Sequence, residues 1–461
     1  MTRPRALTAL TRFGLGPRPG ELTAISSDPV GYVYEQCLDP HAGLVEEELW
    51  SITELRRWYT QFRKDLVKTR RFDRNPDASD EMRAVAREVR LRRRGFTREV
   101  VSGEMGARFK KSVETDHPFI ERLVLFWADH FAVKRNQGQG TRIVMGNFER
   151  EVIRRHVLGY FEDMLFASTT HPAMLIYLDN ASSVGPNSRL GKRRGTTSVN
   201  ENLAREVLEL HTLGVGGGYT QADVIALAET LSGWVGGFDK DGLGLIFDED
   251  VHEYGPRTIL GQTYETEGAV QLEEVLPDLA KHPSTARYIA TKLARHFIAD
   301  DAPQALIEEL TDTFLSTGGD LREMAMTLIE SDLAWEGEPK KTVPPYDFIV
   351  SSLRATDAGV PDSRFLSRSA SNLAQAVWMP PSPAGWPDGD NAFLGGDSML
   401  ERVDYARILA DRHVRIDSVQ DLARDLFGEA LDPFVAEAID RAEDQRQALV
   451  LLLMSPAFHR R

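Results

Sequence analysis

The stretch VNENLAREVLELHTLG (Val199–Gly214) carries the signals of a complete helix. Ser198 precedes Glu201 by three residues, which is the spacing of a capping box that satisfies free backbone donors at a helix start. Gly214 stands where many helices end in a left-handed residue. The apolar residues between these signals recur at helical spacing, at Val199, Leu203, Val207 and Leu210. The pattern therefore predicts a helix with one buried face.

Three polar residues of this helix fall on one line. A turn of roughly 100° per residue aligns Asn202, Glu206 and Glu209, and it places Glu206 between two leucines. A carboxylate on a packed face costs free energy unless it meets a cation, a metal ion or several donors. Glu206 is therefore a candidate functional residue. The structural alternative is an ion pair with one of three arginines, Arg205, Arg287 or Arg295.

Eight segments of the chain carry motifs of one protein family and follow one another in that family's order. They are LVLFWADHF (Leu123–Phe131), MLIYLDN (Met174–Asn180), NENLARE (Asn200–Glu206), ELHTLGVGGGYTQADV (Glu209–Val224), LSGW (Leu231–Trp234), HEYGPRTILG (His252–Gly261), HPSTARYIATKLARHF (His282–Phe297) and PPSPAGWPDG (Pro380–Gly389). Through them the chain resembles a widespread bacterial family catalogued as domain of unknown function 1800. The resemblance covers nearly the whole chain and implies no settled biochemical role. Two positions depart from the family pattern: Glu229 stands where relatives usually carry Arg, and Arg257 where Lys is typical.

Composition describes an acidic protein of ordinary hydrophobicity. The 461 residues carry a net charge of −15, with 42% hydrophobic and 27% charged residues, which is typical of a soluble globular protein. This charge argues against nucleic acid as the main partner, because phosphate binding needs clustered positive charge. The single cysteine, Cys37, excludes an intrachain disulfide and a thiolate metal cluster.

The chain also lacks the sequence signals of membrane insertion. It has no run of about twenty apolar residues, so we expect no membrane span. Arg12 interrupts the apolar part of the N-terminal stretch MTRPRALTALTRFGLG, which does not read as a signal peptide. We therefore expect a cytoplasmic protein, although the resemblance implies that many relatives are exported.

Helical periodicity dominates the chain, so the predicted fold class is mainly α: a large multi-helix globular domain with a small β-hairpin insertion. We expect one domain over residues 1–461, with N-terminal charged helices at 1–115, a site-bearing core at 116–300 and C-terminal helices at 301–461. Short runs broken by Gly and Asp at 233–264 predict a sheet of two or three strands. Residues 181–197 show no periodicity, and could form a mobile basic lid or a surface insertion.

The first helices are rich in basic residues. Lys64–Arg74 and Arg83–Arg98 include the run Arg92–Arg94. Such a patch could bind anions, but in an acidic helical protein it is more often a solvated or acid-paired face.

The candidate site combines carboxylate and imidazole groups, which suit a divalent metal ion. The predicted metal ligands are Glu206, Glu209, His252, His130 and Asp179, and the predicted catalytic residues are Glu206, Glu209 and His252. The predicted substrate-binding residues are Asn202, Arg205, Arg287, Lys292 and Trp234. For His130 and His282, a packed imidazole or a helix cap is the structural alternative. No HExxH metal motif and no GxSxG nucleophile motif is present.

Two functions follow from these patterns. The first is an enzyme, either a metal-assisted hydrolase or an oxidoreductase, in which the ion activates a bound water and a carboxylate acts as base. The second is a non-catalytic scaffold or maturation partner. Relatives are often encoded beside a sulfatase-like family, so the resemblance implies a sulfatase-like protein as the possible partner.

Overall fold

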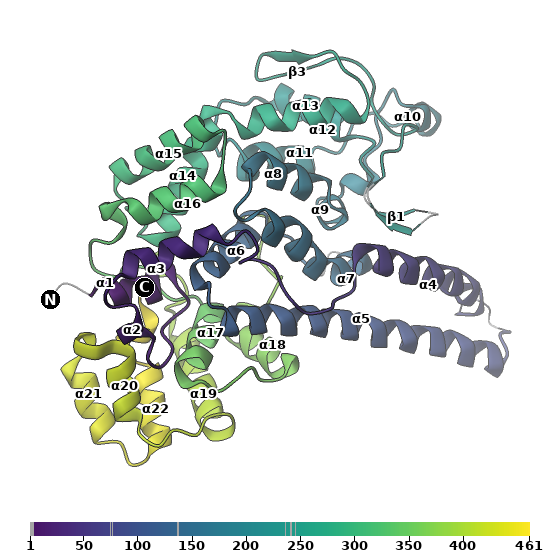
Figure 1. The fold of residues 1–461 in the computed structure, drawn as a ribbon. Coiled ribbons are helices and arrows are strands. Elements are labelled where there is room, and N and C mark those ends of the chain that lie inside the picture. The colour runs from purple at the N-terminus through teal and green to yellow at the C-terminus, as the bar shows by residue number, and fades with distance from the viewer. Residues whose placement is uncertain are drawn as a thin grey trace.

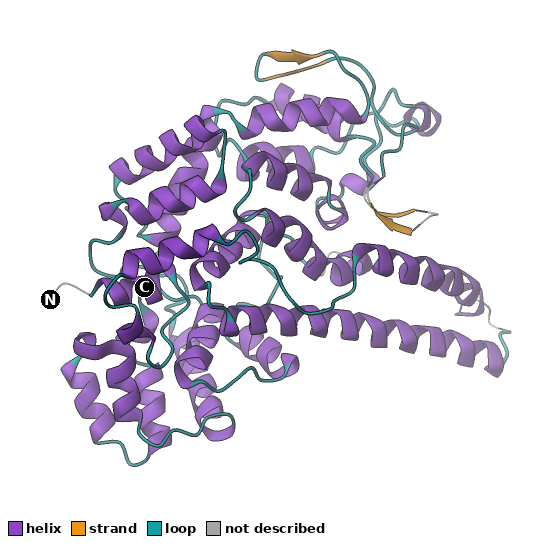
Figure 2. Ribbon diagram, in the orientation of Figure 1, coloured by secondary structure: helices purple, strands orange, loops and turns teal. Residues whose placement is uncertain are grey.

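The computed structural model describes residues 4–461 apart from 74, 76, 136–137, 236, 240–241 and 245, and it confirms a mainly helical fold (Figures 1 and 2). The N-terminal region holds three short helices and two long ones. They are α1 (Arg5–Thr8), α2 (Glu21–Ala24), α3 (Pro29–Glu35), α4 (Ile52–Asp73) and α5 (Asp80–Glu114). Helices α4 and α5 lie side by side and project from the body as an arm (Figure 1).

The central region contains nine α-helices among the described residues: α6 (Pro118–His130), α7 (Gly138–Phe148), α8 (Phe161–Thr170), α9 (Pro172–Tyr177), α10 (Arg189–Arg194), α11 (Asn202–Glu206), α12 (Gln221–Leu231), α13 (Ala269–Ala280) and α14 (Pro283–Phe297). Three of them, α6, α9 and α14, begin at a His-Pro pair, and in the last two the histidine side chain caps the helix. The Nδ1 atoms of His171 and His282 accept the N–H groups of Ala173 and Ser284. His282 is thus a helix cap.

Two antiparallel hairpins interrupt the helices. Strand β1 (Gly237–Asp239) pairs with β2 (Gly242–Gly244), and β3 (Arg257–Ile259) pairs with β4 (Gln262–Tyr264). Both lie within the predicted insertion at 233–264, of which residues 236, 240–241 and 245 are outside the described part. The small β insertion is confirmed, as two separate hairpins.

The C-terminal region is helical up to the end of the chain. Its α-helices are α15 (Gln304–Thr317), α16 (Leu321–Glu330), α17 (Pro345–Thr356), α18 (Ser363–Asn372), α19 (Gly396–Arg412), α20 (Val419–Phe427), α21 (Pro433–Asp440), α22 (Gln445–Leu453) and α23 (Pro456–His459). An irregular segment, 373–395, joins α18 to α19. It contains the PPSPAGWPDG motif and bears on the site described below.

The helix predicted at 199–213 is shorter and less regular than its pattern suggests. Helix α11 covers only Asn202–Glu206 and continues as a π-helical turn, Val207–His211. A second π-helical turn, Glu149–Arg154, follows α7. A π turn holds more residues than an α turn and changes which side chains share a face. A projection at 100° per residue therefore fails beyond Glu206.

Two hydrophobic cores meet inside the molecule. The larger is built from helices between α1 and α16, and the smaller from the C-terminal helices with residues of α5 such as Phe109. Helix α1 contributes to both, through Ala6 and Leu7 respectively. Trp378, on the irregular segment, also packs against both cores. The seam between two packed units is a usual place for a binding site.

The predicted loop 181–197 is docked on the body. It includes helix α10, which Ser188 caps by accepting the N–H of Gly191. The backbone N–H of Gly185 donates to the Val251 carbonyl, and Asn187 binds the buried carboxylate of Glu253 through its N–H and its amide. The lack of apolar periodicity was misleading because polar contacts hold this segment.

The length and polarity of the helices bear on whether the chain could cross a membrane. Within the described residues, every helix is too short or too polar to cross a bilayer.

Candidate acid–base site

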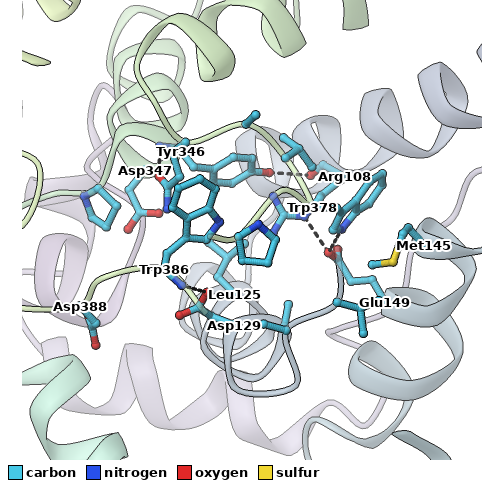
Figure 3. A pocket seen from close by; sticks show the side chains of 18 of the residues that line it. Arg108, Leu125, Asp129, Met145, Glu149, Tyr346, Asp347, Trp378, Trp386 and Asp388 are labelled. Atoms are coloured by element: carbon cyan, nitrogen blue, oxygen red, sulfur yellow. Dashed lines mark hydrogen bonds and ion pairs between the residues drawn. The ribbon is translucent and has the colours of Figure 1, made fainter. Parts of the chain in front are cut away.

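A cavity of about 100 Å³ lies at the seam between the two cores. Its walls come from α5, α6, α7, α14 and α17 and from the irregular segment 375–388 (Figure 3). Tyr346, Trp378 and Trp386 supply aromatic surface, and carboxylates project between them. Aromatic walls with a few convergent polar groups are typical of small-molecule sites.

Asp129, near the end of α6, is the most perturbed acid of this cavity. Its Oδ1 accepts the backbone N–H of Trp386 at 2.7 Å, and among the described residues its carboxylate has no other hydrogen bond. The carboxylate keeps some accessible surface because it faces the cavity, while protein surrounds it otherwise. Burial raises the pKa of Asp129 to about 7, although the Trp386 bond and the charge of Lys292 act in the opposite direction.

Gly385 allows this close approach of the irregular segment to α6. Its φ is +87°, and a Cβ atom there would lie 2.6 Å from the Asp129 carbonyl oxygen and 2.7 Å from its Cγ. No side chain fits in that space. The glycine of the AGW motif is thus needed to bring the Trp386 N–H to the carboxylate.

His296 and Asp388 form a second polar pair at the cavity, with 3.0 Å between Nδ1 and Oδ2. Burial lowers the pKa of His296 to about 4, so the ring is neutral at pH 7 and donates its Nδ1–H to Asp388. Burial alone would raise the pKa of Asp388, but the surrounding groups, His296, Arg461 and Lys341, lower it. Asp388 is therefore ionised and Asp129 is the group that titrates near neutrality.

Lys292 and His130 connect this cavity to the π-helical turn Val207–His211. The Lys292 ammonium donates to His130 Nδ1 at 3.1 Å, and His130 Nε2 is 3.1 Å from the carbonyl oxygen of His211. Since Nδ1 accepts, the proton of the neutral ring is on Nε2. Burial and the Lys292 charge keep the pKa of His130 well below its usual value. His130 therefore serves as a packed connector, and is not free to bind a metal ion.

Buried ion pairs make the far wall rigid. Glu149 accepts from the Arg108 Nε at 2.7 Å and from the Trp378 indole N–H at 2.9 Å, while Arg154 donates to both Glu149 and Glu121. Glu149 lies on the π turn after α7, which directs it to this wall. With its charges matched, the wall leaves Asp129 as the group available for proton transfer.

The predicted central carboxylates lie elsewhere and are only partly buried. Glu206 has no hydrogen bond or ion pair among the described residues, and burial followed by the charge of Glu209 raises its pKa. Glu209 accepts the Tyr219 hydroxyl at 3.1 Å. The predicted arginine partner is absent, because Arg205 binds Glu201 instead. Glu206 is partly buried, as its place between two leucines indicates, but the expected ion-pair partner is missing among the described residues.

His252 is buried in a different environment. Its Nδ1 donates to the Ser232 carbonyl at 2.5 Å, and its ring packs on Phe247 and Tyr254. The Ser232 hydroxyl donates to the Glu229 carbonyl and accepts the N–H of Glu253. Its hydrogen bonds to the backbone therefore give it a structural role. These contacts fix the β insertion to α12. Neither Glu206 nor Glu209 is among the contacts of His252.

The remaining predicted residues also have structural surroundings. Asp179 is exposed at φ +59°, and its carbonyl accepts the Asn200 amide. Asn202 and Arg287 are exposed, and Trp234 is buried against Phe166 and Phe247. Of the predicted substrate-binding residues, Lys292 alone lies beside the cavity.

The predicted metal set does not assemble. In the described part of the chain no three His, Cys, Asp or Glu side chains are grouped so as to hold an ion. Glu206 and Glu209 are neighbours, but His130 is bonded to Lys292 and the His211 carbonyl, His252 to the Ser232 carbonyl, and Asp179 is exposed. The metal centre predicted from these five residues is therefore not formed in the described part of the chain.

The two departures from the family pattern contact each other. Arg257 Nε lies 2.9 Å from Glu229 Oε2. The carboxylate at 229 therefore balances the arginine at 257 and does not change the charge of the cavity.

Two of the motifs singled out in the sequence reach the cavity, but through other residues than those predicted. Sequence reasoning chose His130 from FWADHF and Lys292 from the KLARHF helix, while their neighbours Asp129 and His296 line the cavity. The signal was present: Lys292 and His296 are four apart on one helix face, and Asp388 follows a Gly-Trp-Pro turn. What was missing was the approach of a distant loop.

The fold and the cavity together define a mainly helical protein with a buried, ion-paired, aromatic-walled site. The model of the family described as Protein of unknown function (DUF1800) matches residues 8–460, and the chain belongs to that family. No curated protein and no solved structure matches the chain. The proposed enzyme and the sulfatase-like partnership therefore have no named relative to support either of them.

Proposed function

We propose that this protein is an enzyme that moves a proton to or from a small polar substrate bound in the seam cavity, with Asp129 as general acid and base. One observation carries the proposal: a carboxylate with a pKa of about 7 faces a cavity and keeps one oxygen free of protein hydrogen bonds. A group whose pKa is close to the ambient pH exchanges protons most effectively in both directions.

The surroundings of Asp129 suit this role. The Trp386 N–H holds one oxygen, so the other is oriented toward the cavity. The neighbouring carboxylates of Glu149 and Asp347 are matched by Arg108 and Arg122, which leaves the walls close to neutral. This favours a substrate that is polar and uncharged. The cavity volume of about 100 Å³ limits the bound part to a few non-hydrogen atoms or water molecules.

General-base-assisted hydrolysis fits this arrangement. Ionised Asp129 would take a proton from a water molecule as the water oxygen bonds to the electrophilic centre of the substrate, and would return that proton to the leaving group. Atoms and charges balance, since water is the only co-reactant. Asp388 and His296 would position the loop and α14 around the cavity.

A panel of chromogenic esters, amides and glycosides tests the proposal with purified protein. We expect turnover of at least one class, and a loss of about 100-fold or more in kcat for Asp129→Asn, the lower range for a lost general base. Asp312→Asn is the matched control, because Asp312 is exposed on α15 and lies outside the cavity lining.

A titration of the Asp129 carboxyl by NMR supplies the second arm. A pKa near 7 that disappears in the variant supports the role, whereas a pKa below 5 would overturn it whatever the substrate panel gives.

A further inference from the structure

A second, larger hollow lies at the base of the arm, where α4 and α5 meet α7. It is an open groove of about 760 Å³. Five arginines line it: Arg93, Arg94 and Arg98 from α5, Arg135 from the turn before α7, and Arg142 from α7. Among its described lining residues there is no Asp or Glu. In a chain of net charge −15, this concentration of positive charge is unexpected.

The arginines of the groove lack acidic partners of the kind that Arg108, Arg122 and Arg154 have. On the adjacent surface Asp65 of α4 is paired with Arg92. Within the described residues, Arg94, Arg98 and Arg142 form no ion pair or hydrogen bond. Like charges confined to one groove repel one another, so an anion bound between them would relieve that repulsion.

Arg135 gives an independent sign of a missing partner. Among the described residues its buried Nε has no hydrogen-bond partner, and one Nη atom meets only the Met105 sulfur at 3.9 Å. A buried guanidinium N–H without an acceptor is costly, since each such group normally binds an oxygen. Its backbone N–H donates to the Trp378 carbonyl, so the residue is held firmly in place.

The floor of the groove is rigid and apolar. Trp58 stacks on Phe96 with 3.6 Å between ring centroids and on Phe62 at 5.2 Å. These rings already use one another's faces and give no open platform for stacking a base. An apolar floor lowers the local dielectric and strengthens the attraction between guanidinium groups and an anion.

We infer that this groove binds a compact ligand carrying two or more phosphate-type oxyanion groups, either a soluble polyphosphate or the headgroup of an anionic lipid. Guanidinium groups match phosphate oxygens in geometry and charge. Helix α7 contributes Arg142 and Ile143 to the groove and Met145 and Phe148 to the Asp129 cavity, so the two linings share no residue of this helix. The inference does not depend on the proposed enzymatic role.

Isothermal titration of the full-length protein with inorganic tripolyphosphate tests the inference at constant ionic strength. We expect saturable one-site binding, and a loss of at least tenfold in affinity for Arg94→Ala/Arg98→Ala. The control is Arg412→Ala/Arg415→Ala, which removes the same charge from exposed arginines near the C-terminal end of α19. Circular dichroism confirms that both variants fold.

A second arm distinguishes the two sources. Sedimentation with vesicles of phosphatidylglycerol and phosphatidylcholine, lost in the groove variant and kept in the control, assigns the site to a lipid headgroup if tripolyphosphate binds weakly. Tripolyphosphate binding without sedimentation assigns it to a soluble ligand. If neither probe binds, or if both double variants lose binding equally, the inference is overturned. Binding of a uridine oligonucleotide alone would also overturn it.

Discussion

Asp129 and Glu206 show how the same chemical group takes different roles according to its neighbours. Both are carboxylates on helices and both have raised pKa values, chiefly through burial. Asp129 faces a cavity and is held by one backbone N–H, whereas Glu206 lies at a partly exposed surface beside Glu209. A shifted pKa indicates function only where a cavity gives the group something to act on.

Replacing Asp129 with Asn should stabilise the protein at neutral and alkaline pH. The folded-state pKa of about 7 lies above the unfolded value, so the wild type loses stability as the pH rises from about 4 to about 7. The shift corresponds to about 4 kcal/mol at most, and contact with cavity water reduces it to about 2 kcal/mol. Urea unfolding of both proteins at pH 4 and pH 8 measures the difference. An equal difference at both pH values would contradict the assigned pKa.

Replacing Glu206 with Gln should change stability by no more than about 0.5 kcal/mol, with the variant favoured at high pH. The carboxylate has no cation to lose, and its raised pKa means that ionisation costs more in the folded state than in the unfolded state. The thermal midpoint of the variant should therefore match the wild type at pH 4 and exceed it slightly at pH 8. A large loss of stability would show a partner for Glu206 and restore the predicted buried pair.

At the scale of elements, irregular segments position the site and regular helices provide its walls. The AGW turn brings a backbone N–H to α6, and a π turn directs Glu149 to the cavity. Both depend on local geometry that hydrophobic periodicity does not report. Segment 181–197 is similar, since buried polar contacts to Glu253 hold it.

Gly385→Ala should destabilise the protein by about 3 kcal/mol, from left-handed backbone strain together with the clash at Asp129. Gly359→Ala is the matched control. It also has a positive φ, of +66°, but no atom lies within 4 Å of the added Cβ. Chemical denaturation should give about 1 kcal/mol for the control. Equal losses would mean that the approach of the turn to α6 is not tight.

Glu253→Ala should release the segment around α10. The carboxylate accepts two hydrogen bonds from Asn187, each of 2.7 Å, and both are lost. Limited trypsin digestion should then cut first after Arg189, Lys192, Arg193 or Arg194, sites that the wild type should protect. Glu249→Ala, at an exposed neighbouring position, is the control. Early cleavage of the wild type at these sites would favour the mobile lid first expected from the sequence.

At the scale of the whole molecule, a network of buried charges crosses the seam between the two cores. Arg154 and Glu121, both almost fully buried, lie next to Ser112, whose hydroxyl also contacts Tyr346 of the C-terminal core. The network joins α5, α6 and α17 beneath the cavity. It links the packing of the cores to the shape of the site.

Arg154→Ala should cost about 4 kcal/mol, because it leaves the carboxylates of Glu121 and Glu149 buried without their shared cation. The loss should shrink as the pH falls. Burial acts to raise the pKa of Glu149, but Arg108 and Arg154 hold it below its usual value, and the variant gives up part of that lowering. The control is Arg424→Ala, which breaks an exposed pair with Asp421 and should cost less than about 1 kcal/mol. Thermal unfolding at pH 5 and pH 8 measures both. A loss below 1 kcal/mol for Arg154→Ala would contradict the network.

The sequence by itself determined the mainly helical class, the place of the small β insertion and the motifs that belong to the family, whereas the predicted capping box of Ser198 and Glu201 is not formed, because Glu201 itself is the N-cap of α11 and no side chain caps it. These follow from period, capping and turn chemistry, which act between residues a few positions apart. Only the tertiary structure decided which residues of those motifs meet: Asp129 with Trp386, Lys292 with His130, and five arginines in one groove. Such contacts depend on the packing of distant elements, on one glycine and on π turns. Burial among those elements then shifts the pKa of each group, and local spacing along the sequence does not report burial.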